Sequence, residues 1–260
     1  MITIAKLPRA GLTNKLLVWA DGVIYAKLNS SNFIVTPWYH FSIGPFIRNE
    51  RSKRLYFGYF KKPSFLEGIV ALFFALIFNF IKKYDFLRKI MGNKIFSTVP
   101  IYSDFTAHIR EHRWIVKEEF FKMLNSAVQK RLQNKPKIQI GVHIRLGDFK
   151  LMNISTPLEY YKKAILKLRE SFGSDLAVTI FSDGTDDELH EILCLKGVER
   201  ATNKQDIDDL VQLSKSEYLV LSQDSSFGYF AAFVSDATVI CKPSNKNGIV
   251  TNEIEEWIIV

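Results

Sequence analysis

Short hydrophobic strands alternate with amphipathic helices through the second half of this 260-residue sequence, and no other feature limits the fold as strongly. The first strand begins the segment at residues 138–149, IQIGVHIRLGDF, where isoleucine or valine occupies every second position from Ile138 to Ile144. A period of two is the signature of a β-strand. Helical and strand-like segments then follow in turn to the C-terminus. Repeated βα units predict an α/β fold with a doubly wound, mostly parallel sheet.

Each of the later elements has its own local indications. Thr156 and Pro157 mark the start of a helix, because threonine suits an N-cap and proline suits the first helical position. An Asp-x-Asp sequence at residues 206–208 lies inside an expected helix, where positions i and i+2 do not face each other. We interpret it as a solvated helix start, not as a metal motif. We expect helices at residues 158–170, 186–195, 206–214, 225–234 and 252–258, and strands at residues 176–181, 198–201, 217–222 and 238–241.

The first half of the chain opens with the same kind of unit, a strand, a loop with Gly11, a helix and a second strand. Residues 133–137, which include Pro136, have the composition of a linker. We therefore expect two domains, residues 1–135 and residues 136–260. The elements expected in the first domain are strands at residues 1–5 and 33–36 and helices at residues 16–28 and 114–132.

Charge is distributed unequally between the two halves. Residues 1–135 hold 22 Lys and Arg against 8 Asp and Glu, which gives +14. The remainder holds 13 against 19, which gives −6, and the sum is the net charge of +8. The basic half should favour anionic partners such as a phosphorylated substrate or an anionic lipid. We expect no nucleic acid as a partner, because no zinc finger, helix-turn-helix or RNP signature is present.

Residues 65–81, FLEGIVALFFALIFNFI, form the most apolar stretch and follow a basic and aromatic segment at residues 48–62. Seventeen residues of helix span roughly 26 Å, which is short of the hydrocarbon core of a bilayer. The sequence therefore argues against a transmembrane helix. Two alternatives remain open, a helix in the protein core or a partner interface, and a helix at a membrane surface anchored by its basic and aromatic flanks.

The two cysteines, Cys194 and Cys241, indicate neither a disulfide framework nor a zinc site. This usage fits a reducing compartment. The N-terminus has only a short apolar stretch before Lys6, so we expect no signal peptide. The expected location is cytoplasmic, with peripheral association at the inner face of a membrane if residues 65–81 lie at its surface.

Polar residues follow three of the predicted strands, and the carboxyl ends of parallel strands lie at one edge of a sheet. Arg145 carries a permanent charge on a planar group that suits a phosphate, and Gly147 lets the backbone turn where a side chain would clash. A helix N-terminus after the third strand would hold a phosphate without a metal, although Ser225 as a simple N-cap is the plainer alternative. The residues expected to converge are His143, Arg145 and Asp148 after the first strand, Asp183 after the second, and Ser225, Ser226 and Phe227 after the third.

The segment HIRLGDF at residues 143–149 resembles the H-x-R-x-G-D motif of the α-1,2-fucosyltransferases, glycosyltransferase family 11, and of the related α-1,6- and protein O-fucosyltransferases. PLEYYKKAI at residues 157–165, IFSDG at residues 180–184 and SSF at residues 225–227 resemble the later motifs of the same group. GLTNK at residues 11–15 is similar to their G-L-G-N-Q loop, with threonine and lysine at the two differing positions.

This resemblance implies a GT-B-type fold, with two Rossmann-like domains and a cleft between them. It also implies a GDP-fucose donor in the second domain, an acceptor at the first, and no cofactor or metal. Arg145 and Asp148 would be the catalytic residues, Arg145 on the diphosphate and Asp148 as a brace. The implied substrate-binding residues are His143 and Asp183 near the guanine or ribose, Arg145, Ser225, Ser226 and Phe227 at the phosphates, and Gly11 and Asn14 near the transferred sugar.

The implied reaction is the inverting transfer of L-fucose to a hydroxyl, O2 of galactose, of a surface glycan or a lipid-linked oligosaccharide. Loss of the diphosphate places developing charge where Arg145 is expected. No general base is evident, and Asp148, Asp21 and His40 remain candidates. The alternatives are a glycosyltransferase of the same fold with another nucleotide-sugar donor, and a non-catalytic membrane-associated relative.

Overall fold

The computed structural model describes residues 2–39, 43, 53–61, 68–73, 76, 94–96, 111–242 and 257–259. The chain divides into two compact units, Met1–Gln129 and Lys130–Val260. The division falls a few residues before the boundary that we expected at residue 135. The functional roles assigned to the two domains stay predictions.

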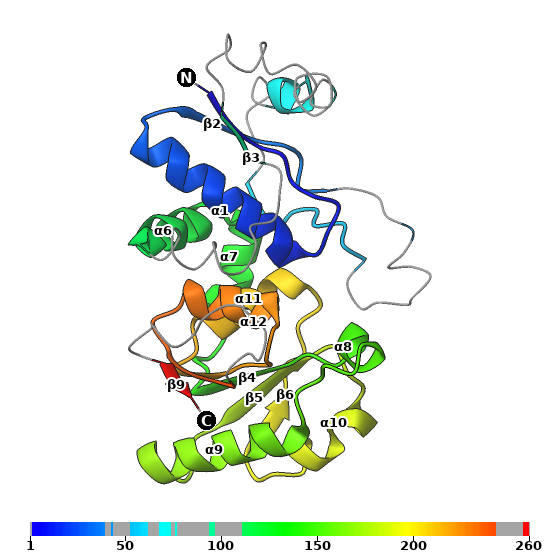
Figure 1. The fold of residues 1–260 in the computed structure, drawn as a ribbon. Coiled ribbons are helices and arrows are strands. Elements are labelled where there is room, and N and C mark those ends of the chain that lie inside the picture. The colour runs from blue at the N-terminus through cyan, green and yellow to red at the C-terminus, as the bar shows by residue number, and fades with distance from the viewer. Residues whose placement is uncertain are drawn as a thin grey trace. The chain divides into compact units, whose positions relative to one another are not determined.

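The first unit contains a three-stranded parallel sheet in the order β2-β1-β3, packed against α1 (Figure 1). Ile4 in β1 pairs with Ile34 in β2 and packs with Ile2, Ile34 and Val70. The first half therefore opens with the strand, helix and parallel strand that we predicted. Its elements are β1 (Ile2–Ala5), α1 (Leu12–Leu28), β2 (Asn32–Val35), β3 (Lys94–Phe96) and α6 (Arg113–Met123).

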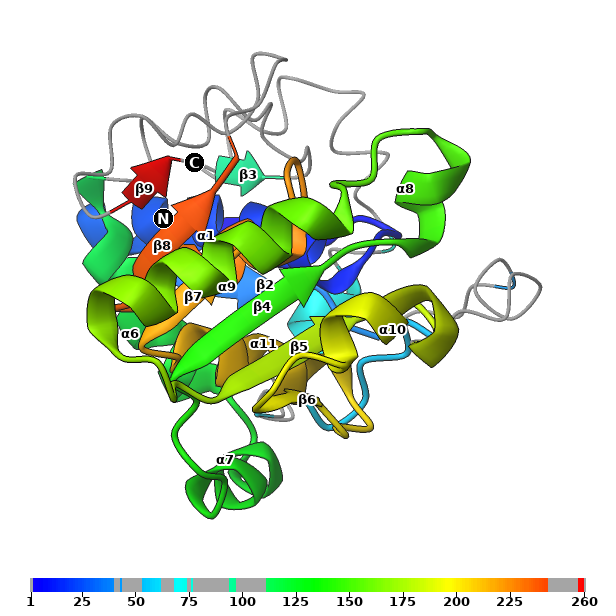
Figure 2. The same ribbon diagram turned by 90° about the horizontal axis from the view of Figure 1, so that it is seen from below.

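The second unit is built on a six-stranded sheet in the order β6-β5-β4-β7-β8-β9, in which every neighbouring pair is parallel. Helices α9 and α10 cover one face, and α11 and α12 cover the other (Figures 1 and 2). This is the doubly wound parallel sheet that the alternation predicted. The elements are α7 (Ser126–Gln133), which crosses the unit boundary, then β4 (Ile140–Ile144), α8 (Gly147–Leu151), α9 (Leu158–Phe172), β5 (Val178–Ser182), α10 (Asp186–Leu193), β6 (Val198–Arg200), α11 (Asp206–Ser214), β7 (Tyr218–Val220), α12 (Ser226–Phe233), β8 (Thr238–Cys241) and β9 (Trp257–Ile259).

Strand β4 lies between β5 and β7, and all five of its residues are buried. Ile140, Val142 and Ile144 belong to one core cluster with the buried face of α9. Because β4 is covered on both faces, its register is strongly specified, and a slip of one residue would exchange core and site side chains. The core thus fixes where the polar residues after Ile144 leave the sheet.

Two expected helices differ from the structure. The helix predicted at residues 114–132 is broken, because Leu124 is extended and forms an antiparallel bridge with Phe60. Asn125 then starts α7, with its Oδ1 accepting from the amide of Ala127 at 2.8 Å. The helix predicted at residues 252–258 is wrong at its end, because residues 257–259 form β9 beside β8. Residues 252–256 lie outside the described part of the chain.

Only part of the apolar stretch at residues 65–81 is described, and residues 68–73 within it are helical. Val70 packs against the cluster of Ile4, whereas Ile69, Leu72 and Phe73 are more than half exposed. Among the described residues, no helix is both long and apolar enough to cross a membrane. The packing of Val70 favours a core helix, and the exposed apolar side chains favour a helix at a membrane surface, so both alternatives remain.

Candidate active site

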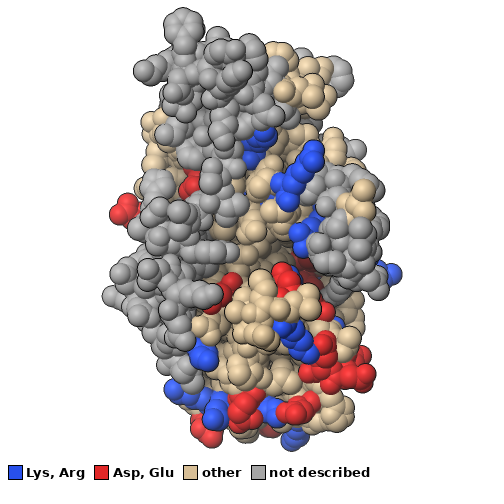
Figure 3. Space-filling view, turned by 45° about the vertical axis from the view of Figure 1, so that its right-hand side comes forward, with Lys and Arg blue, Asp and Glu red and all other residues tan. Residues whose placement is uncertain are grey.

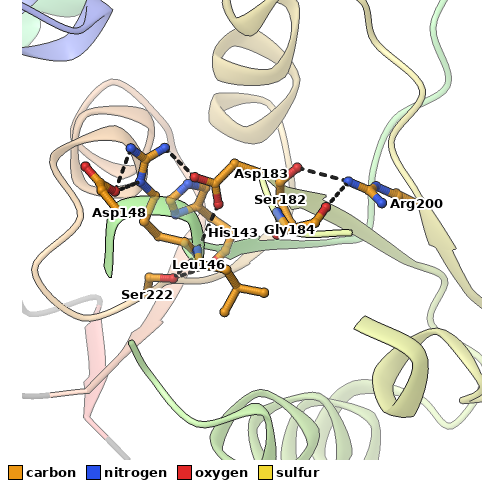
Figure 4. Close-up of polar contacts among 9 residues, drawn as sticks. His143, Leu146, Asp148, Ser182, Asp183, Gly184, Arg200 and Ser222 are labelled. Carbon is orange, nitrogen blue, oxygen red and sulfur yellow. Dashed lines mark hydrogen bonds and ion pairs between the residues drawn. The ribbon is translucent and has the colours of Figure 1, made fainter. Parts of the chain in front are cut away.

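The polar ends of β4, β5 and β7 meet at one edge of the second sheet (Figure 4). The pairing of β4 with β5 continues to Ile144 and Ser182, so Arg145 and Asp183 leave the sheet side by side. On the other side of β4, the amide of Ser222 donates to the carbonyl of His143 at 3.0 Å. The convergence that we predicted from the strand ends is therefore present.

Arg145 lies between two carboxylates. Its Nη1 is 2.8 Å from Oδ2 of Asp183, and its Nη2 is 2.9 Å from Oδ1 of Asp148. Its Nε also donates to Oδ1 of Asp148, at 3.0 Å. The guanidinium side chain remains 31% exposed, so one side of it faces solvent. The planar group is thus held in a fixed orientation, as recognition of a phosphate requires.

Asp183 is held more firmly than Asp148. Its second oxygen accepts from the amide of Leu146 at 2.8 Å, so both of its oxygens have partners within the loop after β4. A Cβ at Gly147 would lie 2.5 Å from Oδ2 of Asp183. Glycine is therefore required at this position so that the Asp183 carboxylate can approach closely. We expected a side chain at residue 147 to clash, and the Asp183 carboxylate is the group that it would meet.

The loop that carries Asp183 is anchored from outside the predicted site by Arg200 at the end of β6. The Nη2 of Arg200 donates to the carbonyl of Gly184 at 2.5 Å (Figure 4). Its Nη1 pairs with Asp186. Sequence reasoning missed Arg200. A basic residue at the end of the strand next to β5 was the available indication.

Helix α10 fixes the same loop through a capping box, in which Thr185 and Glu188 bond each other's backbone amides. Lys150 of α8 lies 2.5 Å from Oε1 of Glu188. The short helix after Arg145 is thereby tied to the helix after Asp183, and the two polar strand ends are held together.

His143 is almost completely buried and stacks on Phe227, with ring centroids 5.3 Å apart. Burial, together with the nearby charge of Arg145, lowers the pKa of His143 to about 3, so the ring is neutral. Its Nδ1 has no hydrogen-bond partner in the part of the chain that the structure describes. The ring of His143 packs against Phe227 and lies close to Gly228. The contact of His143 with a nucleotide stays a prediction.

Ser225 is the N-cap residue of α12, but its side chain makes no capping hydrogen bond. The plain N-cap alternative is therefore not supported by its hydroxyl. Ser225 is buried, whereas Ser226 and Phe227 are partly exposed. The first turn of α12 contains no acidic residue that would oppose an anion at its positive end.

Gly11 and Asn14 lie at the start of α1 in the first unit. Gly11 is the N-cap residue, and Oδ1 of Asn14 is buried without a hydrogen-bond partner among the described residues. The neighbouring Lys15 is also buried, donates from Nζ to the carbonyl of Trp38 at 2.8 Å, and has its pKa lowered by burial to about 8. The roles of Gly11 and Asn14 at a donor sugar stay predictions.

The Asp-x-Asp sequence is not the solvated helix start that we expected. Asp208 is buried and accepts from Nε and Nη2 of Arg131 at 3.1 and 2.8 Å. The expected helix is present as α11, but a buried carboxylate needs a charged partner, and Arg131 supplies it. Within the described residues, no three His, Cys, Asp or Glu side chains gather closely enough to hold a metal ion.

Comparison with known proteins identifies the family. The profile of glycosyl transferase family 11 matches residues 81–256, which is most of the chain. The chain belongs to glycosyl transferase family 11. It is thus a glycosyltransferase of the α-1,2-fucosyltransferase family, and the predicted family and enzyme class are confirmed. No curated protein matches the sequence.

Solved fucosyltransferase structures share the fold. An α-1,6-fucosyltransferase, NodZ, soaked with GDP-fucose matches with a TM-score of 0.58 and 14% identity, over 90% of this chain and 92% of that one. NodZ from Bradyrhizobium matches with 0.57 and 12% over the same shares. A mutant of FUT1 from Arabidopsis thaliana in complex with GDP matches with 0.56 and 11%, over 95% of this chain and 72% of that one. The family member therefore has the α/β fold with parallel sheets found in these fucosyltransferases.

Proposed function

We propose that this family 11 glycosyltransferase transfers L-fucose from GDP-fucose to O2 of a galactose residue, with inversion and without a metal. The acceptor oxygen forms a bond to the anomeric carbon while the bond from that carbon to the phosphate oxygen breaks. GDP departs with the electron pair of the broken bond, and the acceptor proton passes to a base. The proposal also assigns the two units to a GT-B arrangement, with the donor held by the second unit.

The observation that carries the proposal is the oriented guanidinium of Arg145 where three polar strand ends meet. Charge develops on the departing phosphate in an oxocarbenium-like transition state. A fixed donor aimed at that charge contributes about 3–4 kcal/mol to such a step. Family membership and the GDP or GDP-fucose used with the similar structures support this choice of donor.

The proposal does not assign the general base that takes the acceptor proton. Asp148 already has Arg145 as a partner, which favours the bracing role over proton abstraction. Asp21 lies in α1, and His40 lies outside the described residues. We place the acceptor at the first unit, near Gly11 and Asn14, because α1 begins there and the first amides of a helix have no acceptor within the helix itself.

We further propose that the enzyme works in the cytoplasm at the inner face of a membrane, on a lipid-linked or surface glycan precursor. The basic charge of the first half and the exposed Ile69, Leu72 and Phe73 support a surface contact.

The test is transfer from GDP-fucose to galactose-terminated oligosaccharides, with and without EDTA, followed by linkage analysis of the product. We expect an α-1,2-linked product whose yield EDTA does not change. A requirement for Mn²⁺ would reject the metal-free mechanism. Thermal stabilisation by UDP and not by GDP would instead favour another nucleotide-sugar donor. Full biological function of an Arg145→Ala variant that binds no GDP would favour a non-catalytic relative.

A further inference from the structure

Regular pairing between β4 and β7 stops before the site begins. The register joins Ile140–Val142 to Tyr218–Val220, and one further main-chain hydrogen bond joins the amide of Ser222 to the carbonyl of His143. Arg145 lies beyond it, and its amide donates to the hydroxyl of Ser222 at 2.7 Å. A serine side chain thus takes the place of a main-chain acceptor where Arg145 leaves the sheet.

The hydroxyl of Ser222 uses all of its hydrogen-bonding capacity. It donates to the carbonyl of His143 at 3.0 Å, accepts from the amide of Arg145, and lies 2.6 Å from the phenol oxygen of Tyr161. A hydroxyl has one proton and two acceptor lone pairs. Since the proton of Ser222 goes to His143, Tyr161 is the donor in the third contact.

Tyr161 extends this contact to a second loop. It belongs to α9 and is completely buried, and burial raises the pKa of its phenol to about 12. It also interacts with the hydroxyl of Thr156, which accepts from the amide of Gln223 at 3.0 Å. Thr156 was expected to cap α9, but Pro157 occupies that position and Thr156 bonds across to the loop after β7.

We propose that Tyr161, Ser222 and Thr156 are positioning residues for the diphosphate site. Their buried hydroxyls set the main chain at Arg145 against the loop that leads from Ser222 to α12. A diphosphate bound by both the guanidinium and the first turn of α12 needs that spacing to be fixed. The inference rests on the proposed function, and it adds residues that touch neither substrate nor reacting atoms.

The adjacent Tyr160 supplies a matched control. Its hydroxyl is also buried, but it has no hydrogen-bond partner among the described residues. Its ring packs against that of Tyr161 in an edge-to-face contact, with centroids 5.2 Å apart. Tyr160→Phe and Tyr161→Phe therefore remove the same atom from neighbouring positions, and only the second removes a link to Ser222.

The experiment measures GDP affinity by calorimetry for the full chain and for Tyr161→Phe, Tyr160→Phe and Ser222→Ala. Exchange of the Arg145 amide hydrogen is followed in the same proteins. We expect Tyr161→Phe to weaken GDP binding by about tenfold, the scale of one buried hydrogen bond, and Ser222→Ala to weaken it more. The Arg145 amide should exchange faster in both variants. Tyr160→Phe should leave both quantities at the wild-type level.

Two results would overturn the proposal. One is GDP binding by Tyr161→Phe within about twofold of wild type, even if its melting temperature falls, because that describes a purely structural contact. The other is an equal loss in Tyr160→Phe, because that would reflect packing. Ser222→Ala provides the comparison if Tyr161→Phe does not fold. A wild-type chain that does not bind GDP would reject the proposed function instead, and amide exchange at Arg145 tests the network without any ligand.

Discussion

The two carboxylates that contact Arg145 differ in how readily a phosphate could displace them from the guanidinium. Asp183 is bound by both oxygens and its side chain is 25% exposed, whereas Asp148 uses one oxygen and is 52% exposed. Together with Arg145 they carry a net charge of −1, which opposes the approach of a diphosphate. A phosphate oxygen can take the Nε and Nη2 edge only if Asp148 gives way. Asp183 shapes the loop, whereas Asp148 braces the guanidinium in the free protein but covers the edge that a bound phosphate would take.

Substitution of the two residues should consequently change GDP affinity in opposite directions. Asp148→Asn removes a competing charge and should tighten GDP binding by about fivefold, since two charges in water interact by about 1 kcal/mol at contact distance. Asp183→Asn should weaken binding at least about tenfold, because it loosens the guanidinium and the Leu146 amide. Titration calorimetry measures both. Weaker binding in Asp148→Asn would show that this carboxylate supports the ligand.

Burial of a neutral His143 makes folding stability depend on pH. Its pKa is about 3 in the folded chain and 6.5 for the free group, so the unfolded chain binds more protons between these values. Stability should therefore fall as pH is lowered below 6.5, with a slope of up to about 1.4 kcal/mol per pH unit. Urea unfolding of wild type and His143→Gln at pH 7 to 4 measures the difference. His190→Gln, at an exposed histidine, should follow the wild-type profile.

At the scale of elements, substitutions at two glycines should distinguish effects on GDP binding from effects on folding stability. Gly147→Ala should weaken GDP binding strongly, because the new Cβ displaces the Asp183 carboxylate. At Gly11 a Cβ meets nothing within 4 Å, so Gly11→Ala should change stability by no more than about 1 kcal/mol, the scale of an N-cap. Thermal unfolding and transfer rates measured together distinguish these cases. Full activity of Gly11→Ala would contradict the placement of Gly11 at the transferred sugar.

Most elements of the second unit were predictable because strands such as β4, β5 and β8 are largely buried apolar runs. Thr238–Cys241 was placed at its observed bounds. The same pattern pointed to the polar residues after β4, β5 and β7, which the structure brings together and whose roles stay predictions. The break at Leu124 was not predictable, because it depends on pairing with Phe60, 64 residues away. Strand β9 was missed for a similar reason, since its apolar residues suit a strand or a helix until β8 is known.

The supports behind the site were less visible in the sequence than the site itself. Arg200 and Tyr161 act through hydrogen bonds to loops that are not adjacent to them in the chain. Tyr161 lies in a helix, and Arg200, at the end of β6, was not at one of the three strand ends that we searched. Asp208 shows the converse, because a motif that suggested solvent exposure is buried against Arg131. The roles and burial of these residues depend on side-chain contacts between segments distant in the sequence, which a local sequence pattern does not reveal.

At the scale of the whole molecule, the two halves of the chain differ in net charge. On the face of the second unit drawn in Figure 3, acidic and basic side chains are interspersed. Ion pairs within the second unit include that of Lys162 with Glu191, at 2.6 Å. The first half carries the excess of +14, with 22 basic and 8 acidic residues in residues 1–135. Attraction to an anionic surface should therefore reside in the first half.

Vesicle binding tests this expectation. The full chain should sediment with vesicles that contain anionic lipid at low salt, and about 0.5 M salt should release most of it, since screening shortens the range of surface charge to a few ångströms. Vesicles of zwitterionic lipid alone serve as the control. Equal binding to both vesicle types would indicate apolar insertion, and binding to neither would remove the membrane-surface proposal.

The central claim is that Arg145 forms the charge of a GDP-sugar site in the second unit. Its most direct test is calorimetric titration of GDP into the wild-type chain and into Arg145→Ala and Arg145→Lys. We expect wild type to bind GDP, Arg145→Ala to lose about 100-fold or more, and Arg145→Lys to recover only part, because lysine lacks the planar fork. Arg145→Ala that binds GDP as tightly as wild type would contradict the account.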